Sequence, residues 1–545
     1  MEIAPTSTVK LYSGIPLENT YTDTLYFATL ADQSSYFSGL TPVKVFNSQM
    51  YQRVNKGIFE ASCRADDIYN CNYMAFQNTG FGNKWFYAFI TKIEYINNHN
   101  CQVFFEIDVM QTWMFDCTLE HCFIERQHSA GDNIGSNILP EPVEVGEYVY
   151  DVNNGQYDTT NPYDRLFPSL ESQAILIMSS EPYPSDGWTW GNRFDNVYSG
   201  CYLYAVRATS NHADTNIRQM INNFIEKPEV ILAMYMCPLN LLPIPDNETI
   251  EWYDYLHPVP DNKTASTLNY IGDAPASDDS FGGYTPRNKK LYTYPYNFFQ
   301  VDDGNGSNLK LRYEFFNNHR PQLLVQGCIT NPVQIRLTPY NYRGTTHVLD
   351  SGTLNEHQVE CRTEFLTIAN YPMCSWNYDT YRAWVAQNSI PIILQSGASA
   401  LSALTSKGFK GLVGASGINL TADLLSREYK ASLMGDTCKG NISSGNVNFA
   451  SNRQQFYGGR CHITMDYAIM IDKFFDMYGY AYNQIGIPNT HSRPHWNYVK
   501  TIGAKIIGQC PCDDLNKMCQ IYDNGITFWK NASEVGHYQL DNSPT

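Results

Sequence analysis

Between residues 85 and 110, apolar and polar side chains alternate in two short runs that are separated by a polar turn. The turn has the sequence Asn97-Asn98-His99-Asn100, and the second run sets apolar side chains opposite Glu106 and Asp108. Because alternation with a period of two residues is typical of a half-buried strand, we predict a β-hairpin here. Its first strand should carry an apolar face formed by Trp85, Tyr87, Phe89, Ile93 and Tyr95.

Short apolar or aromatic runs of this kind recur along the chain. Pro, Gly, Asn and Asp separate them, and the turn-rich stretches 153–168 and 242–287 are predicted to be connections. Many short strands at such spacing are typical of β-sandwiches and β-barrels. We therefore predict a mainly β protein with barrel or sandwich domains, whose further strands lie at 173–179, 201–207, 230–236, 309–316 and 322–330.

One segment differs in composition from these short runs and turns. Residues 388–422 contain no Asp or Glu, and Lys407 and Lys410 are their only charged residues. The rest is mostly Gly, Ala, Ser, Leu and Ile, and a short amphipathic helix is predicted around Leu424. Two interpretations compete: a pair of buried core helices, and an apolar loop that meets lipid. Composition alone favours the core, because apolar stretches of this length are usually buried.

Composition adds limits on size and partners. A chain of 545 residues exceeds the usual size of a single core, so several substructures are expected. Its 40 Tyr residues favour strands and subunit interfaces. The net charge of −17 and the lack of a basic stripe argue against a protein that binds nucleic acid tightly. An acidic wall would nevertheless suit a channel through which nucleic acid passes without binding.

The chain begins without the basic region and apolar run of a secretory signal, so we expect synthesis in the cytoplasm. Its fifteen cysteines are then expected to be reduced thiols. We find no phosphate-binding loop and no His-Glu-x-x-His sequence, and we predict neither an enzyme nor a cofactor site. His128 is predicted to be a structural surface residue.

One set of residues has the chemistry of a metal site. Two imidazoles and two thiolates would suit tetrahedral zinc. Pro494 interrupts any helix that would align the two histidines, and Cys-x-Cys is tighter than the usual spacing, so buried thiols without metal are the default expectation. The residues in question are His491, His495, Cys510 and Cys512, with Cys519 nearby.

Several long aromatic blocks stand out in the sequence, the longest being Phe76-Gln-Asn-Thr-Gly-Phe-Gly-Asn-Lys-Trp-Phe-Tyr-Ala-Phe89 and Phe104-Phe-Glu-Ile-Asp-Val-Met-Gln-Thr-Trp-Met-Phe115. These blocks resemble segments of the tail-knob proteins of small short-tailed bacteriophages with protein-primed DNA replication, the Bacillus podophage type. The blocks run in the same order over nearly the full length. The others lie at 123–128, 281–286, 288–296, 483–485, 496–499 and 523–529.

This resemblance implies a hexameric ring that forms the distal tail tube of the virion. Six apolar loops would plug the tube, leave it to penetrate the host membrane and form a channel for DNA ejection. The implied segments are an N-terminal tube region at 1–152, a middle region at 153–380, an apolar and partly helical loop insertion at 381–450, and a C-terminal region at 451–545. Segment 388–422 lies where the plug should be, which reverses the preference from composition.

The resemblance also implies partners and residues. The partners are further copies of the chain, other tail proteins above and at the tip, the host membrane and passing double-stranded DNA, and synthesis would occur in the cytoplasm of the host bacterium. Trp85, Tyr87, Phe89, Phe105 and Trp113 would form a structural aromatic face. The membrane-contacting residues would be Ile390, Ile392, Ile393, Leu394, Leu401, Leu404, Phe409, Leu412, Val413 and Ile418.

Two other classes of protein are alternatives at this point. A trimeric receptor-binding tail fibre or adhesin would also be aromatic and β-rich, but it would lack the mid-chain apolar segment. A tail-associated cell-wall hydrolase would need a convergent pair of carboxylates or a metal site. The adjacent carboxylates of Asp66 and Asp67 do not by themselves provide one.

Overall fold

The computed structural model describes two compact units. Unit 1 consists of Met1–Glu147, Ser280–Tyr296 and Ile463–Thr545, and unit 2 of Tyr148–Asp279 and Asn297–His462. The described residues are 7–49, 57–151, 165–167, 173–183, 191–194, 197–224, 230–245, 247–260, 266–267, 280–303, 306–316, 319–321, 323–329, 333–339, 342, 364–368, 373–374 and 456–544.

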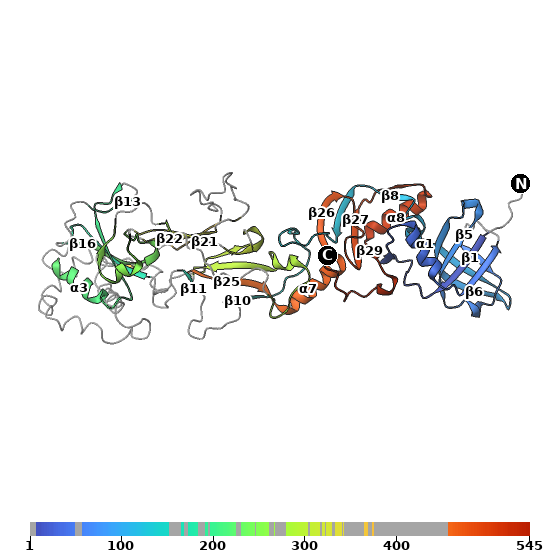
Figure 1. Ribbon diagram of the computed structural model, residues 1–545, viewed down its shortest axis with the longest axis horizontal. Coiled ribbons are helices and arrows are strands. Elements are labelled where there is room, and N and C mark those ends of the chain that lie inside the picture. Colours follow the sequence, from blue (N-terminus) through green and yellow to red (C-terminus); the bar gives the residue numbers. More distant parts are fainter. Residues whose placement is uncertain are drawn as a thin grey trace, which may run out of the picture. The chain divides into compact units, whose positions relative to one another are not determined.

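Unit 1 begins with a six-stranded antiparallel sheet that curls into an open barrel (Figure 1). Its two edge strands do not pair among the described residues, but their side chains come into contact, since the ring centroids of Phe46 and Phe59 lie 5.3 Å apart. Inside is a core, here called the barrel core, that includes Val9, Leu11, Phe46, Met74, Phe76, Ala88 and Val103. The strand order is β3 (Lys44–Gln49), β1 (Ser7–Ser13), β5 (Cys71–Gln77), β6 (Trp85–Asn97), β7 (Asn100–Ile107) and β4 (Ile58–Ala61).

A second sheet in unit 1 combines the two ends of the chain. Its order is β2 (Asp23–Leu25), β29 (Ile526–Trp529), β27 (Trp496–Ile502), β9 (Cys122–Gln127) and β26 (Tyr480–Gly486). Only β2 and β29 run parallel. Two further strands pair as a separate antiparallel ribbon. They are β8 (Cys117–Leu119), which precedes β9 in the chain, and β28 (Ile506–Gly508), which follows β27.

Short helices connect these sheets. Helix α1 (Leu30–Gly39) begins at a capping box of Thr29 and Asp32, and α2 (Val109–Trp113) begins where Asp108 accepts hydrogen bonds from two backbone amides. Helix α8 (Cys512–Asn524) packs against β27 and α2. The apolar residues between them form one core, here called the interlayer core, that includes Tyr12, Phe37, Tyr73, Tyr87, Phe89, Met518, Trp496 and Trp529.

Helix α7 (Met465–Tyr478) also belongs to unit 1. It packs against the segment 280–296 through Phe281, Leu291 and Phe475. Gly479 ends this helix with a φ of +63°, and a Cβ there would lie 2.4 Å from the carbonyl carbon of Gln127. A glycine is therefore required where the helix end meets β9.

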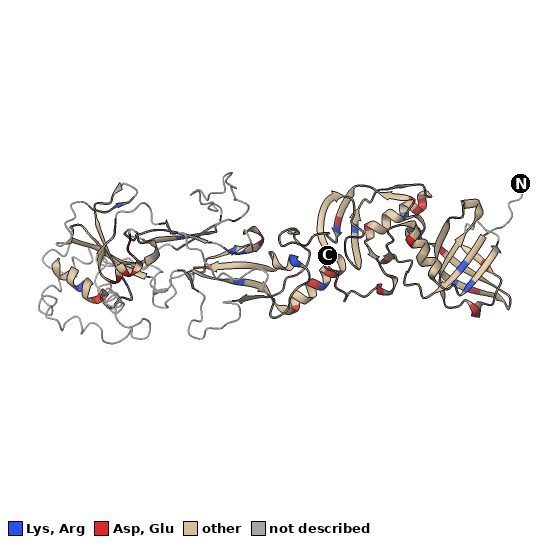
Figure 2. Cartoon of the chain, in the orientation of Figure 1, with Lys and Arg blue, Asp and Glu red and all other residues tan. Residues whose placement is uncertain are grey.

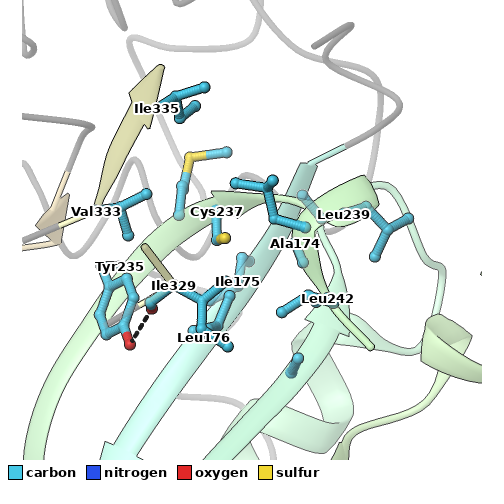
Figure 3. Packing of buried hydrophobic residues seen from close by; sticks show 14 of the residues in the cluster. Ala174, Ile175, Leu176, Tyr235, Cys237, Leu239, Leu242, Ile329, Val333 and Ile335 are labelled. Atoms are coloured by element: carbon cyan, nitrogen blue, oxygen red, sulfur yellow. Dashed lines mark hydrogen bonds between the residues drawn. The ribbon is translucent and has the colours of Figure 1, made fainter. Parts of the chain in front are cut away.

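Unit 2 is built from small antiparallel sheets around one large core. Figure 3 shows part of it, where the hydroxyl of Tyr235 donates to the carbonyl oxygen of Ile329 at 2.8 Å. The buried ends of the strands read as nearly continuous apolar runs, such as Ala174–Ile177. Helix α3 (Ala213–Asn223) contributes Ile217 and Met220.

The described strands of unit 2 fall into four sheets. The first two are β10 (Tyr148–Asp151), β25 (Phe456–Ile463), β19 (Asn297–Asp302) and β20 (Asn308–Leu311) with β11 (Arg165–Phe167), and β17 (His257–Pro258), β15 (Tyr202–Arg207), β12 (Gln173–Ser179), β16 (Ile231–Pro238) and β24 (Met373–Cys374). The others are β18 (Ser266–Thr267), β21 (Leu323–Cys328), β22 (Gln334–Pro339) and β23 (Leu366–Ile368), and the pair β13 (Arg193–Phe194) and β14 (Val197–Tyr198).

The predicted mainly β architecture is confirmed, and so is the hairpin, which corresponds to β6 and β7. The strand predicted at 173–179 coincides with β12. Only the first part of the run 309–316 is a strand, because residues Tyr313–Phe315 form a 3-10 turn after β20. Among the described residues, no helix combines the length and the apolar character that crossing a membrane requires.

Candidate functional site

The predicted aromatic face is divided between two cores of unit 1. Tyr87 stacks on Phe37 at a centroid distance of 4.1 Å, and Phe89 also lies in the interlayer core. Trp85 and Trp113 pack against the same core and are only partly buried. Phe105 instead packs against the barrel core. The residues therefore do not share one surface.

A β-bulge at Thr91 corrects the predicted face of β6. Pairing with β7 shifts by one residue between Ile90 and Lys92. Such an insertion reverses the side on which every later side chain points. Ile93 consequently packs against the barrel core, and Tyr95 is 63% exposed. The alternation was read correctly up to Phe89, but its continuation on one face was wrong.

An exposed apolar row crosses the second sheet of unit 1. Ile485 lies opposite Phe123, which in turn lies opposite Ile502 on β27. These side chains are 75%, 37% and 57% exposed, in that order. β26, which carries Ile485, is the last strand in its sheet, and no strand of the described residues pairs with its outer side. We call these three residues the apolar row.

Buried carboxylates hold segment 280–296 against α7. Asn288 donates through Nδ2 at 2.8 Å to one oxygen each of Asp472 and Asp476, and Tyr284 donates to Asp472 at 2.6 Å. Burial, and then the charge of Asp472, raise the pKa of Asp476 to about 6. The cluster is fully engaged in hydrogen bonds within the protein, so its evident role is structural.

His128 is buried, with 1% exposure, which corrects its prediction as a surface residue. Its Nδ1 accepts a hydrogen bond from the Tyr498 amide at 2.7 Å, and its Nε2 lies 3.0 Å from the carbonyl oxygen of Asp476. Trp496 Nε1 donates to that same carbonyl at 2.7 Å. Two side chains thus satisfy a carbonyl in the last turn of α7 that the helix leaves without a partner.

This arrangement predicts acid sensitivity at His128. Burial, and then the charge of Arg493, lower the pKa of His128 to about 3. An unfolded histidine takes up a proton near pH 6.5, so the stabilisation is complete above that pH and is lost as the pH falls toward 3. At about 1.4 kcal/mol per pH unit, the loss should reach about 2 kcal/mol at pH 5.

The measurement is urea unfolding of wild type and His128→Gln, followed by tryptophan fluorescence at pH 7 and pH 5. The difference in unfolding free energy between the two should shrink by about 2 kcal/mol at the lower pH. Comparing the two proteins cancels the contributions of Asp108 and Asp476 to the pH dependence of stability. Their pKa values are raised to about 6, so their contribution to stability rises as the pH falls, opposite to that of His128. His99→Gln, in the exposed hairpin turn, is the control. A difference that does not change with pH would contradict the assignment.

The residues considered for a zinc site contact different groups and do not converge on one point. His495 Nδ1 lies 2.9 Å from a carboxylate oxygen of Glu534, and His491 stacks on Tyr26. Cys510 contacts Cys117 instead. Within the described ranges, no group of three His, Cys, Asp or Glu side chains has the geometry of a metal site.

The membrane-contacting residues predicted between Ile390 and Ile418 lie outside the described residues. Acidic and basic residues occur on the same elements of unit 1 (Figure 2). Helix α8, for example, contains both Asp514 and Lys517. Sequence reasoning missed the apolar row and the buried carboxylates. The signal for the latter was the spacing of Asp472 and Asp476, which puts both on one face of a helix.

Comparisons with known proteins agree with one another along nearly the full length of the chain. The family described as the C-terminal domain of Bacillus phage phi29 tail knob protein gp9 matches residues 260–543, and the family described as the N-terminus of the caudoviral major tail protein matches residues 5–118. Tail knob proteins gp9 of Bacillus phages PZA and phi29 are 25% and 26% identical, each over 98% of both chains.

A solved structure shares the fold. The tail knob protein gp12 of bacteriophage C1 superimposes with a TM-score of 0.61 over 97% of this chain and 98% of its own, at 14% sequence identity. The gp9 family match extends over more than half of the chain. The chain therefore belongs to the phage tail knob protein gp9 family and is a structural protein of the virion tail.

Proposed function

We propose that six copies of this chain form a ring that makes the distal tube of the phage tail, and that viral DNA leaves the particle through it. The proposal rests on the full-length similarity to tail knob proteins. Copies of the chain, neighbouring tail proteins and the host membrane are the partners. The protein acts by changing conformation, without catalytic turnover, and is made in the cytoplasm of the infected host.

The observation that favours side-by-side assembly is the apolar row on the open edge of a sheet. A closed ring needs a head-to-tail contact between two different patches of neighbouring copies. An edge strand offers unpaired backbone groups to a neighbouring chain, and exposed apolar side chains beside it add hydrophobic gain on burial. Ile485 on β26 combines both features.

The ring predicts that Ile485→Asp prevents assembly. Negative-stain microscopy of the wild type should show particles with six-fold symmetry, whereas the variant should remain monomeric, because a carboxylate would be buried in the contact without a partner. Tyr69→Asp is the matched control, since Tyr69 is also highly exposed, at 78%, but lies before β5 of the barrel. Normal rings of Ile485→Asp would exclude this edge, and wild-type particles of another symmetry would exclude the hexamer.

Membrane penetration is assigned to the apolar segment 388–422. Lys407 and Lys410 would meet anionic headgroups first, at about 1 kcal/mol each. A trigger can release the segment only if it favours the released state over the plugged state. The channel should be lined by acidic or neutral side chains, because a basic lining would bind the phosphates of passing DNA.

A further inference from the structure

We infer that Cys117 and Cys510 of unit 1 form a disulfide once the virion is outside the host cell. Their Sγ atoms lie 3.4 Å apart, and both residues are partly exposed. Cys117 is the first residue of β8, and Cys510 lies just before α8. The two residues are 393 positions apart in the sequence and are brought together by the fold.

The β8–β28 ribbon directs the two thiols toward each other. Cys117 lies opposite Gly508, and the Gln509 amide donates to the Asp116 carbonyl oxygen at 3.2 Å, which continues the ladder by one step. A Cβ at position 508 would come within 2.4 Å of the Cys117 Sγ. The sulfur therefore occupies the space that a side chain at 508 would fill, and it lies in contact with the Cys510 Sγ.

Closing the bond needs only a small movement. A disulfide has a sulfur–sulfur distance of about 2.05 Å, so the sulfurs must approach by about 1.4 Å from their separation of 3.4 Å. A second pair provides a contrast. The sulfurs of Cys63 and Cys101 lie 4.0 Å apart, but both residues are buried against the barrel core, where a dissolved oxidant has no access.

The chemistry requires an oxidant, for which a small disulfide such as oxidised glutathione is the simplest class. One protein thiolate attacks it, forms a mixed disulfide and releases one glutathione thiolate. The second protein thiolate then attacks the mixed disulfide and releases the other. Two protein thiols lose two electrons and two protons, and two glutathione thiols form. Burial raises the pKa of Cys117 to about 12, which makes the reaction slow at neutral pH.

The bond would join two parts of unit 1 that other contacts already tie together. Trp113 Nε1 donates to the Asp514 carboxylate at 2.8 Å, and Lys517 pairs with Glu106. Cys117 belongs to the segment matched by the major tail protein family, and Cys510 to the segment matched by the tail knob family. A covalent link across so long a loop reduces the conformational entropy of the unfolded chain. It would thereby stabilise the assembled tail where chaperones are absent.

The test uses the full chain with Cys512→Ser, because Cys512 is exposed and would compete for the oxidant. The protein is equilibrated with oxidised glutathione at pH 8.5 and digested without reductant, and linked peptides are identified by mass spectrometry. We expect the Cys117–Cys510 link to dominate, and the melting temperature to rise by several degrees relative to the reduced protein.

Further variants separate the pair from the other cysteines. Cys117→Ser and Cys510→Ala should each abolish the shift in melting temperature on oxidation, whereas Cys63→Ser should retain it. The mass spectrum of the oxidised parent requires no variant of the pair, so a folding defect in either one does not affect it. Glutathione adducts without a link, links between other cysteines, or equal melting temperatures with and without reductant would each overturn the inference.

Discussion

Deleting residues 388–422 is expected to leave rings assembled and to abolish the release of dye from anionic liposomes. The segment has no acidic residue, and its small side chains allow close backbone approach inside a tube. The same residues can enter a bilayer without carrying a carboxylate into it, and their glycines allow more than one backbone arrangement. Dye release by intact and deleted rings, with ring formation checked by microscopy, measures the effect.

A single substitution should give a graded version of this loss. Leu412→Asp introduces a charge that costs about 2.5–3.5 kcal/mol at the centre of a bilayer on insertion scales, so it should reduce release strongly. Leu412→Met keeps the site apolar and should release dye as the wild type does. Equal release by well-formed deleted rings would refute the assignment. Failure of the deleted chain to fold would instead identify the segment as part of a core.

The fold was predictable where the pattern of side chains is local. The hairpin of β6 and β7 follows from alternation and a polar turn, and β12 follows from a compact apolar run. The bulge at Thr91 was not predictable, because an inserted residue leaves no mark in the alternation itself. The pairing of β2 with β29 depends on contacts between the two ends of the chain, which periodicity does not encode.

The polar interior of unit 1 was harder to predict for the same reason. A histidine after Ile124-Glu125-Arg126 looks like a surface residue until α7 and β27 are placed around it. Burial of His128 is set by partners more than 300 positions away. The contact of Cys117 with Cys510 is equally non-local. Sequence spacing instead grouped Cys510 with the histidines, which lie with other partners.

The substitution Glu141→Gln is expected to have the largest effect on stability in unit 1. The Glu141 side chain is fully buried and pairs with Lys290 and Arg126, whose side chains are 2% and 9% exposed. It also accepts a hydrogen bond from the Ala481 amide at 2.8 Å. Glu141→Gln keeps the shape of the side chain but leaves two buried cations without their counter-charge. Breaking such a pair costs about 3–5 kcal/mol, most of it from the charges left behind.

The neighbouring pair of Glu125 and Lys500 provides the control. Its atoms are 2.9 Å apart, but the side chains are 38% and 34% exposed, so water and salt screen the interaction. Glu125→Gln should therefore cost less than about 1 kcal/mol. Adding Lys290→Met to Glu141→Gln removes one stranded charge and should recover part of the loss. Urea unfolding of the four proteins measures these differences. Similar losses of unfolding free energy for Glu141→Gln and Glu125→Gln would show that burial does not strengthen the ion pairs of Glu141 with Lys290 and Arg126.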